Sequence, residues 1–463
     1  MTKKIGLILI TAFVFVAFLG FSPQDAVAQS KKKKRQARNL AAQGDQFYRQ
    51  KKYGEAIQKY SEAIAIMPKF PFAHFSKGYA HYNLRQHGQA IRDFTTALDQ
   101  GYKPLDIYAV RWQSHFLQKD WANALADVKS AQKRAKKNAY FHIAEGQIRH
   151  EQRDYQGAVV AYQRAVDLNT KNNNVHYFMA RSFNLAGEYS SQKNAAKKAL
   201  DGGTRFPGES WFYIGDSNYR ERNYEEAAKA YEMSMISNPD IYVTYVNLSD
   251  TYRNLNKFQK AIDVAKKGIG KFPNDGNLYV SLSWYYSLAD KHASAIGAAK
   301  RAIELTPNQY MEHTNLCRAY NDLKEYGSAV RACQDALKLN PGDGETNFYL
   351  GRAFQLLGNA RTAGGYYKKA VTGLKTFTHN NPDYSDGFYL LGNAYFADGQ
   401  KENAIGAYQR CLEISPRFAK ARYNLGYVYS QTGNATAARQ QYTALQQIDP
   451  NLAGKLLTAI ENP

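Results

Sequence analysis

The feature that most limits the fold of this chain is a spacing of 34 residues that recurs along most of its length. Small residues mark it, among them Gly44, Gly78, Gly146, Gly215 and Gly392. Units counted from seven residues before such positions start at 37, 71, 105, 139, 173, 208, 242, 276, 310, 344, 385 and 419. Nine of the eleven spacings are 34 residues, and the other two are 35 and 41. Self-similarity at such a period predicts a repeat architecture.

Each unit carries two stretches whose apolar residues fall three or four positions apart, which is the spacing of one helix face. In the unit starting at 385, the first stretch contains Phe388 and Tyr395 and the second contains Ala404 and Tyr408. We expect the small residue of the first helix to face the Ala twelve positions later, so that the two antiparallel helices approach closely. Aromatic residues one turn further along are expected to fill the space between them.

These units resemble the tetratricopeptide repeat, whose pattern combines an aromatic, Leu-Gly, Tyr, Ala, an aromatic and Pro at fixed offsets. The unit starting at 208 follows it with Trp211, Ile214, Gly215, Ala227, Tyr231 and Pro239. The resemblance covers residues 37–452 and implies an all-α, right-handed α-solenoid of helix-turn-helix repeats. It also implies that the first helices line a concave groove that binds peptides or other proteins.

The predicted organisation is a signal peptide at 1–28, a basic linker at 29–36, twelve repeats and a C-terminal capping helix at 453–463. We expect three blocks of repeats, namely 37–207, 208–384 and 385–452. The second block ends with a seven-residue insertion near 376–382, and Gly364 and Gly365 precede it within a predicted helix. Because glycine within a helix costs about 1 kcal/mol relative to Ala, the junctions near 202–207 and 373–382 are expected to be softer than the rest. The alternative is that both junctions are irregular but well packed.

The N-terminus predicts export. Lys3 and Lys4 precede the uncharged run from Ile5 to Phe21, and a small-residue pattern ending at Ala28 follows. This arrangement is typical of a secretory signal cleaved after Ala28, and it places the protein in the periplasm or at the cell envelope. The alternative is an uncleaved membrane anchor, because about 17 apolar residues are the lower limit for spanning a bilayer.

The chain has a formal charge of +21, which favours acidic partners without naming one. Basic residues concentrate in the run Lys31 to Arg35. This run is either a solvated, disordered spacer or an attachment to an anionic envelope polymer or membrane surface. An export signal leads the chain away from nucleic acid, so we do not expect nucleic-acid binding. The sequence carries no signal for an oligomeric state.

No residue pattern indicates catalysis, a cofactor or a metal. The histidines His74, His142, His176 and His313 share one position of the period, and they are interpreted as replacements for core aromatics too far apart to share a metal. No nucleophile elbow, phosphate-binding glycine loop or His-Glu metal helix occurs, so an enzyme is not predicted. Cys317 and Cys333 lie in one repeat. They are interpreted as two buried free thiols, with a disulfide as the alternative.

The expected function is therefore a non-enzymatic scaffold that binds an extended peptide or protein segment, within an envelope assembly. The alternative is a charge-driven binder of an anionic surface. The implied groove combines aromatic and arginine side chains, which are the residue types favoured at binding hot spots. The predicted groove residues are Phe72, Phe75, Tyr79, Tyr82, Tyr177, Arg181, Phe212, Tyr219, Arg253, Trp284, Arg318, Phe348, Arg352, Tyr389, Tyr423 and Tyr427.

Overall fold

A computed structural model describes residues 23–462, and every regular element in that range is an α-helix. This confirms the predicted all-α class. The chain divides after Lys171 into two compact units, called unit 1 and unit 2 below. Within residues 23–462, no helix is both long and apolar enough to cross a membrane. The apolar run from Ile5 to Phe21, predicted as a signal, lies outside the described residues.

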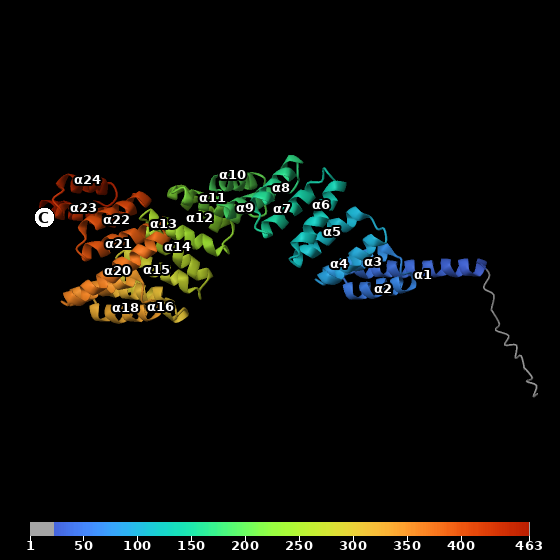
Figure 1. The fold of residues 1–463 in the computed structure, drawn as a ribbon, viewed down its shortest axis with the longest axis horizontal. Coiled ribbons are helices and arrows are strands. Elements are labelled where there is room, and N and C mark those ends of the chain that lie inside the picture. Colours follow the sequence, from blue (N-terminus) through green and yellow to red (C-terminus); the bar gives the residue numbers. More distant parts are fainter. Residues whose placement is uncertain (1–22, 463) are drawn as a thin grey trace, which may run out of the picture. The chain divides into compact units, whose positions relative to one another are not determined.

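Unit 1 consists of four helix pairs that follow one another along the chain (Figure 1). Its helices are α1 (Pro23–Arg49), α2 (Tyr53–Ile66), α3 (Pro71–Asn83), α4 (His87–Asp99), α5 (Pro104–Leu117), α6 (Trp121–Arg134), α7 (Ala139–Glu151) and α8 (Tyr155–Asp167). The basic segment 29–36 is part of α1, so it is a helical extension of the first repeat and not a disordered spacer. Its side chains are exposed, and the first buried residue of α1 is Ala37.

Unit 2 consists of eight further helix pairs and a final helix. Its helices are α9 (Val175–Ala186), α10 (Tyr189–Asp201), α11 (Pro207–Arg220), α12 (Tyr224–Ser237), α13 (Tyr242–Asn254), α14 (Phe258–Lys271), α15 (Gly276–Leu288), α16 (His292–Leu305), α17 (Tyr310–Asp322), α18 (Tyr326–Leu339), α19 (Gly344–Leu356), α20 (Ala360–Asn380), α21 (Ser385–Ala397), α22 (Lys401–Ile414), α23 (Ala419–Gln431), α24 (Ala435–Gln446) and α25 (Pro450–Glu461). The predicted capping helix is present as α25, whose Ala453 and Leu456 are buried against Ala419 and Leu445. α25 therefore packs on the helix pair α23 and α24, as a capping helix does.

Local sequence explains where the helices begin. Eight of the twelve predicted repeat starts, from 71 to 419, coincide with the first residue of a helix, and three others lie within two residues of one. Proline at the first helical position fits α3, α5 and α11, because an N–H there would have no helical partner. Several other helices are capped by an Asp or Asn side chain that accepts a backbone N–H, as Asp275 does for α15 and Asp343 for α19.

The packing within a repeat includes a contact that was not predicted. In six repeats the small residue of the first helix is a glycine that lies against an aromatic ring sixteen positions later. A Cβ placed on Gly44 would lie 2.6 Å from Tyr60 Cε1, and one on Gly392 would lie 2.5 Å from Tyr408 Cε1. Any side chain at these positions would collide with the ring, so glycine is needed for the helices to pack at this distance.

The predicted contact with the Ala twelve positions later also occurs. Ser283 Oγ donates to the Ala295 carbonyl oxygen at 2.9 Å. A Cβ on Gly351 would lie 3.3 Å from the Ala363 carbonyl oxygen.

Cys317 and Cys333 form a disulfide, so their interpretation as free thiols is wrong. Their Cα atoms are 5.1 Å apart, within the range that a disulfide requires. They are separated by sixteen residues, and they therefore occupy the same two facing positions that Gly392 and Tyr408 hold in another repeat. The disulfide links α17 to α18, while Cys411 is buried and free.

The predicted insertion near 376–382 lengthens a helix. α20 has 21 residues where its counterparts have 12 to 14, and it continues without a break through Gly364 and Gly365. Further along, α20 crosses the start of α19 at backbone contact. A Cβ on Gly373 would lie 2.5 Å from the carbonyl oxygen of Gly342, and one on Gly344 would lie 2.5 Å from the nitrogen of Leu374. Glycine on both sides of the crossing permits this approach.

Candidate functional site

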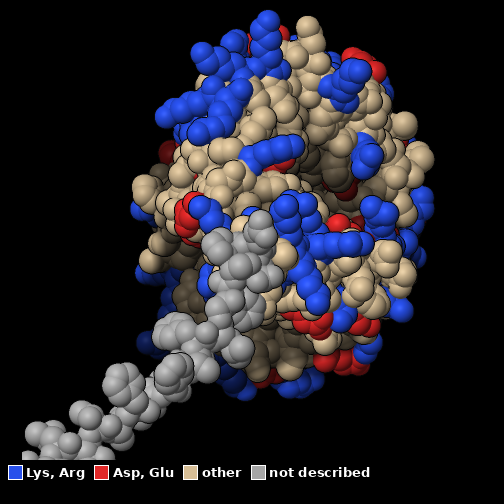
Figure 2. Space-filling model, turned by 90° about the vertical axis from the view of Figure 1, so that its right-hand side faces the viewer, with Lys and Arg blue, Asp and Glu red and all other residues tan. Residues whose placement is uncertain are grey.

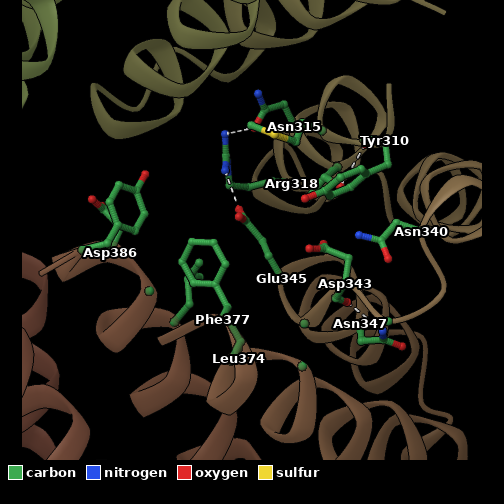
Figure 3. A pocket seen from close by; sticks show the side chains of 18 of the residues that line it. Tyr310, Asn315, Arg318, Asn340, Asp343, Glu345, Asn347, Leu374, Phe377 and Asp386 are labelled. Atoms are coloured by element: carbon green, nitrogen blue, oxygen red, sulfur yellow. Dashed lines mark hydrogen bonds and ion pairs between the residues drawn. The ribbon is translucent and has the colours of Figure 1, made fainter. Parts of the chain in front are cut away.

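A cavity of about 940 Å³ lies within unit 2. Its walls come from the first helices of five successive repeats, α13, α15, α17, α19 and α21, together with the lengthened second half of α20. The loop between α18 and α19, residues 340–343, completes the wall. We call this cavity the unit 2 pocket. Figure 3 draws 18 of its lining residues and labels ten of them.

The repeats curve far enough for α13 to contact α21, and this contact closes one side of the pocket. Arg253 of α13 forms a buried ion pair with Asp386 of α21, and its Nε also donates to Asp250 Oδ1 at 2.7 Å. Burial opposes the charge of Arg253, but the two carboxylates hold its pKa well above the ordinary value. A buried guanidinium such as that of Arg253 requires its carboxylate partners. Arg222 Nη1 also donates to the Glu413 carbonyl oxygen at 2.8 Å.

Arg318 is the central basic residue of the pocket wall. Its guanidinium lies 3.7 Å from the centre of the Trp284 ring, which is a cation–π contact. Nη1 donates to Glu345 Oε1 at 2.7 Å, and Nη2 donates to Asn315 Oδ1 at 2.5 Å (Figure 3). The residue is only 3 % exposed, and its Nε has no hydrogen-bond partner. These contacts fix the position of the Arg318 side chain and leave its Nε without a hydrogen bond.

Three carboxyl groups of the pocket have pKa values above their ordinary range. Burial raises the pKa of Glu345 to about 7, although Arg318 lowers it, and Asp343 and Asp386 raise it further. Burial likewise raises the pKa of Asp343, which caps α19 by accepting from Thr346. Burial raises the pKa of Asp386 despite its contact with Arg253. The pocket thus holds three carboxyl groups that bind protons more tightly than exposed carboxyl groups do.

Apolar and aromatic side chains also remain uncovered in the pocket. Phe377 of α20 is 41 % exposed, and Tyr384, just before α21, is 44 % exposed. The two rings pack edge to face with centroids 5.7 Å apart. Met311 of α17 is exposed on the same lining. Uncovered apolar surface next to polar groups is characteristic of ligand sites.

Three of the predicted groove residues, Arg253, Trp284 and Arg318, are brought together in this pocket. Two others, Phe72 and Tyr79, line a cavity of about 340 Å³ in unit 1, next to Tyr48. These five positions are therefore accessible from a cavity.

The remaining predicted groove residues mostly contact other parts of the protein. Phe348 is buried in the core at 8 % exposure, so its prediction as a groove residue is wrong. Phe75 stacks on Tyr102 at 4.3 Å and packs against the unit 1 core. The others are Tyr82 against Gln113, Tyr177 on Phe206, Phe212 on Tyr231, Tyr219 to Asp250, Arg352 to Asp322, Tyr389 on Phe418, Tyr423 and Tyr427 on each other, and the exposed Arg181.

The predicted groove residues did not include two acidic residues of the pocket, Glu345 and Asp386. Both lie in first helices, α19 and α21, which the family resemblance assigns to the groove. That place in the repeat was a signal, but the predicted residues were confined to aromatic and arginine side chains. Phe377 lies in the insertion, where no repeat position could have indicated its role.

The histidines do not assemble a metal site. His74 and His81 flank Asp93, with nitrogen to oxygen distances of 3.7 and 3.5 Å, and Lys77 lies beside the same carboxylate. Among residues 23–462, no three His, Cys, Asp or Glu side chains are arranged to hold a metal ion.

Comparison with known families identifies the repeats. Models described as TPR repeat or tetratricopeptide repeat match residues 44–84, 113–173, 242–274, 392–433 and 419–452. The chain is a tetratricopeptide repeat protein. Like other members of this family, the protein is a protein-interaction scaffold, and solenoids of this fold are typically non-catalytic. No relative was found among curated protein sequences.

Solved structures similar to this tetratricopeptide repeat protein include the yeast Tom70 crystal structure. It shares 13 % identity over 93 % of this chain and 95 % of that chain, with a TM-score of 0.39. The crystal structure of the APC/C hetero-tetramer Cut9-Hcn1 is another. It shares 14 % identity over 94 % of this chain and 98 % of that chain, with a TM-score of 0.37.

Proposed function

We propose that this protein is an exported, non-enzymatic scaffold that holds an extended peptide or protein segment in the unit 2 pocket. The observation that carries the proposal is the half-open cavity of about 940 Å³ that the first helices of five successive repeats line in an interaction fold. Ligand pockets in proteins measure about 300 to 1,000 Å³, so this volume is at the upper end of that range. A flexible segment with both polar and apolar side chains suits such a lining.

The lining itself supports this use. Hot spots of protein interfaces are enriched in Trp, Tyr and Arg that lie in well-packed surroundings. Trp284 and Arg318 meet this description because each holds the other in place. Such side chains lose little conformational freedom when a partner binds, so contacts with them stabilise a complex efficiently.

Export to the cell envelope is part of the proposal. Its support comes from the basic residues, the apolar run and the small-residue pattern that end at Ala28. The Cys317–Cys333 disulfide agrees with an oxidising compartment, where such bonds persist. A fusion of the full chain to alkaline phosphatase tests export directly. Phosphatase activity is expected because this enzyme forms its disulfides only after export, and a fusion that accumulates without activity would refute this part.

The scaffold role is tested by cross-linking the tagged full-length protein in its native host. After a high-salt wash, mass spectrometry identifies what remains attached. We expect one discrete protein, lost from a Trp284→Ala variant and retained by Trp121→Ala, which removes an equal ring from unit 1. Circular dichroism melts of both variants verify folding. Equal recovery of the partner by all three proteins would contradict a role for the pocket.

A second candidate function, attachment to an anionic surface, rests on α1. Lys31 to Arg35 lie exposed along a helix that extends beyond the first buried residue, Ala37. On the face shown in Figure 2, Lys and Arg side chains outnumber Asp and Glu. Each basic residue near an anionic membrane contributes about 1 kcal/mol, and salt screens the attraction.

Co-sedimentation with lipid vesicles distinguishes this candidate. We expect binding to vesicles that contain anionic lipid and none to neutral vesicles. Binding should fall steeply with salt and disappear when Lys31 to Lys34 are replaced by Gln. Binding that persists in high salt or in the substituted chain would refute attachment through α1.

A further inference from the structure

The charged groups of the unit 2 pocket are not evenly satisfied. Four basic and four acidic residues line it, so the formal charges cancel. Both arginines already have carboxylate partners, Arg253 with two and Arg318 with Glu345. The two lysines, Lys368 and Lys369, lie exposed on α20. No basic group of the lining is therefore buried without a carboxylate.

The acids, in contrast, are incompletely compensated. Asp386 is only 2 % exposed, it lines the pocket, and its Oδ1 has no hydrogen-bond partner. Asp343 accepts hydrogen bonds from the backbone and hydroxyl of Thr346, which carry no charge. A buried carboxylate oxygen without a partner is costly, and a positively charged donor is the group that satisfies it best.

The geometry brings these acids to one space beside an aromatic wall. In Figure 3, the carboxyl groups of Glu345 and Asp343 point toward the same interior space, and the Phe377 ring faces them from α20. Aromatic ring faces attract cations, and they also cover the carbon chain of a long basic side chain. An uncovered ring next to two carboxyl groups is therefore suited to Lys or Arg.

We propose that the unit 2 pocket recognises a basic side chain, arginine or lysine, of a peptide segment in the partner. The inference rests on the proposed function and specifies the chemistry of what the pocket holds. An acidic segment would compete with Glu345 and Asp386 for arginines that already have carboxylate partners, and only the Nε of Arg318 is left without a hydrogen bond. A basic segment uses the free oxygen of Asp386 and the open ring of Phe377.

The first experiment leaves the peptide sequence open. A random heptapeptide phage library is selected on the full-length protein, and each selected peptide is measured again with the Trp284→Ala variant. We expect the peptides whose affinity requires Trp284 to contain Arg or Lys. Replacing that Arg by citrulline, its neutral analogue, should weaken binding at least tenfold.

The other outcomes separate the two proposals. Neutral or acidic peptides that require Trp284 would overturn the basic-side-chain inference and leave the peptide-binding function standing. A selection that yields no peptide requiring Trp284 would overturn both.

A second variant removes charge without removing volume. Glu345→Gln should lower the affinity for the basic peptides at least tenfold, because one charged acceptor is lost. Glu304→Gln is the matched control, since Glu304 is 63 % exposed on α16 and lies outside the pocket. Equal affinities of the two variants would overturn the inference. Melting curves of both variants verify folding, because Glu345→Gln also removes the carboxylate partner of Arg318.

Discussion

Alanine at Gly364 and alanine at Gly373 should change the stability of α20 in opposite directions. Both glycines lie inside this one helix, where Ala is intrinsically better by about 0.5 to 1 kcal/mol. At Gly364, a new Cβ would have no atom within 4 Å, so the whole gain should be realised. At Gly373, the Cβ would lie 2.5 Å from the Gly342 carbonyl oxygen and 2.8 Å from Gly344 Cα.

The cost at Gly373 follows from this crossing. A carbon atom does not approach a backbone oxygen to 2.5 Å, so α20 would have to move away from the start of α19. Overpacking of this kind costs about 1 to 3 kcal/mol, which exceeds the gain in helix propensity. The Gly373→Ala variant should therefore be less stable than Gly364→Ala by about 1 to 3 kcal/mol.

Hydrogen exchange followed by mass spectrometry measures the stability of α20 separately from that of the other helices. Such a local measurement suits a repeat protein that does not unfold in one step. Gly364→Ala should slow exchange of α20 amides by up to about fivefold, and Gly373→Ala should speed it. If both substitutions slowed exchange equally, the backbone crossing of α19 and α20 would be refuted. The same data test the predicted soft junctions near 202–207 and 373–382, because uniform protection through both would contradict three separate blocks.

Four further predictions concern unit 2. Alkylation of the unfolded, unreduced protein should label one cysteine, Cys411, and three labels before reduction would refute the disulfide. Reduction should make Cys317 and Cys333 reactive, and it should lower the free energy of unfolding by up to about 3 kcal/mol for a loop of this length. The pKa of Glu345 is raised to about 7, so between pH 4.5 and 7 the folded protein holds a proton that the unfolded chain releases. Wild type should therefore lose stability relative to Glu345→Gln as pH rises over this range. Chemical denaturation should show a loss of up to about 3 kcal/mol. A basic peptide that favours the carboxylate should bind more tightly as pH rises over the same range, and an affinity independent of pH would argue against contact with Glu345. Asp386→Asn removes one carboxylate partner of the buried Arg253 and should lower the free energy of unfolding by up to about 3–5 kcal/mol. Adding Arg253→Met should recover most of this loss. A double variant as unstable as the single one would show that the ion pair is not the cause.

Repeat organisation follows from sequence because its causes are local. The spacing of apolar residues and the capping groups act over a few positions, so helices begin at the expected Gly276 and Gly344. The contact between positions sixteen apart recurs in many repeats, as for Gly44 and Tyr60. Aligning the repeats on that contact would have paired Cys317 with Cys333 in advance.

The site depends on contacts that no local pattern encodes. Arg253 and Asp386 are 133 residues apart, and they meet because small rotations from repeat to repeat add up until α13 reaches α21. The division after Lys171 likewise has no mark in the repeat spacing. Phe72 and Phe75 lie three positions apart in one helix, yet Phe72 is exposed while Phe75 packs against the core.

The 34-residue period is enough to establish the repeats, the helix pairs and the family, because each repeat uses the same short-range interactions. The pocket requires the folded chain. Its charge balance depends on which acids the curvature buries together, and its aromatic wall depends on the direction in which the lengthened α20 crosses α19. Burial and proximity of this kind are properties of the whole superhelix, which is why the raised pKa of Glu345 cannot be read from its place in the repeat.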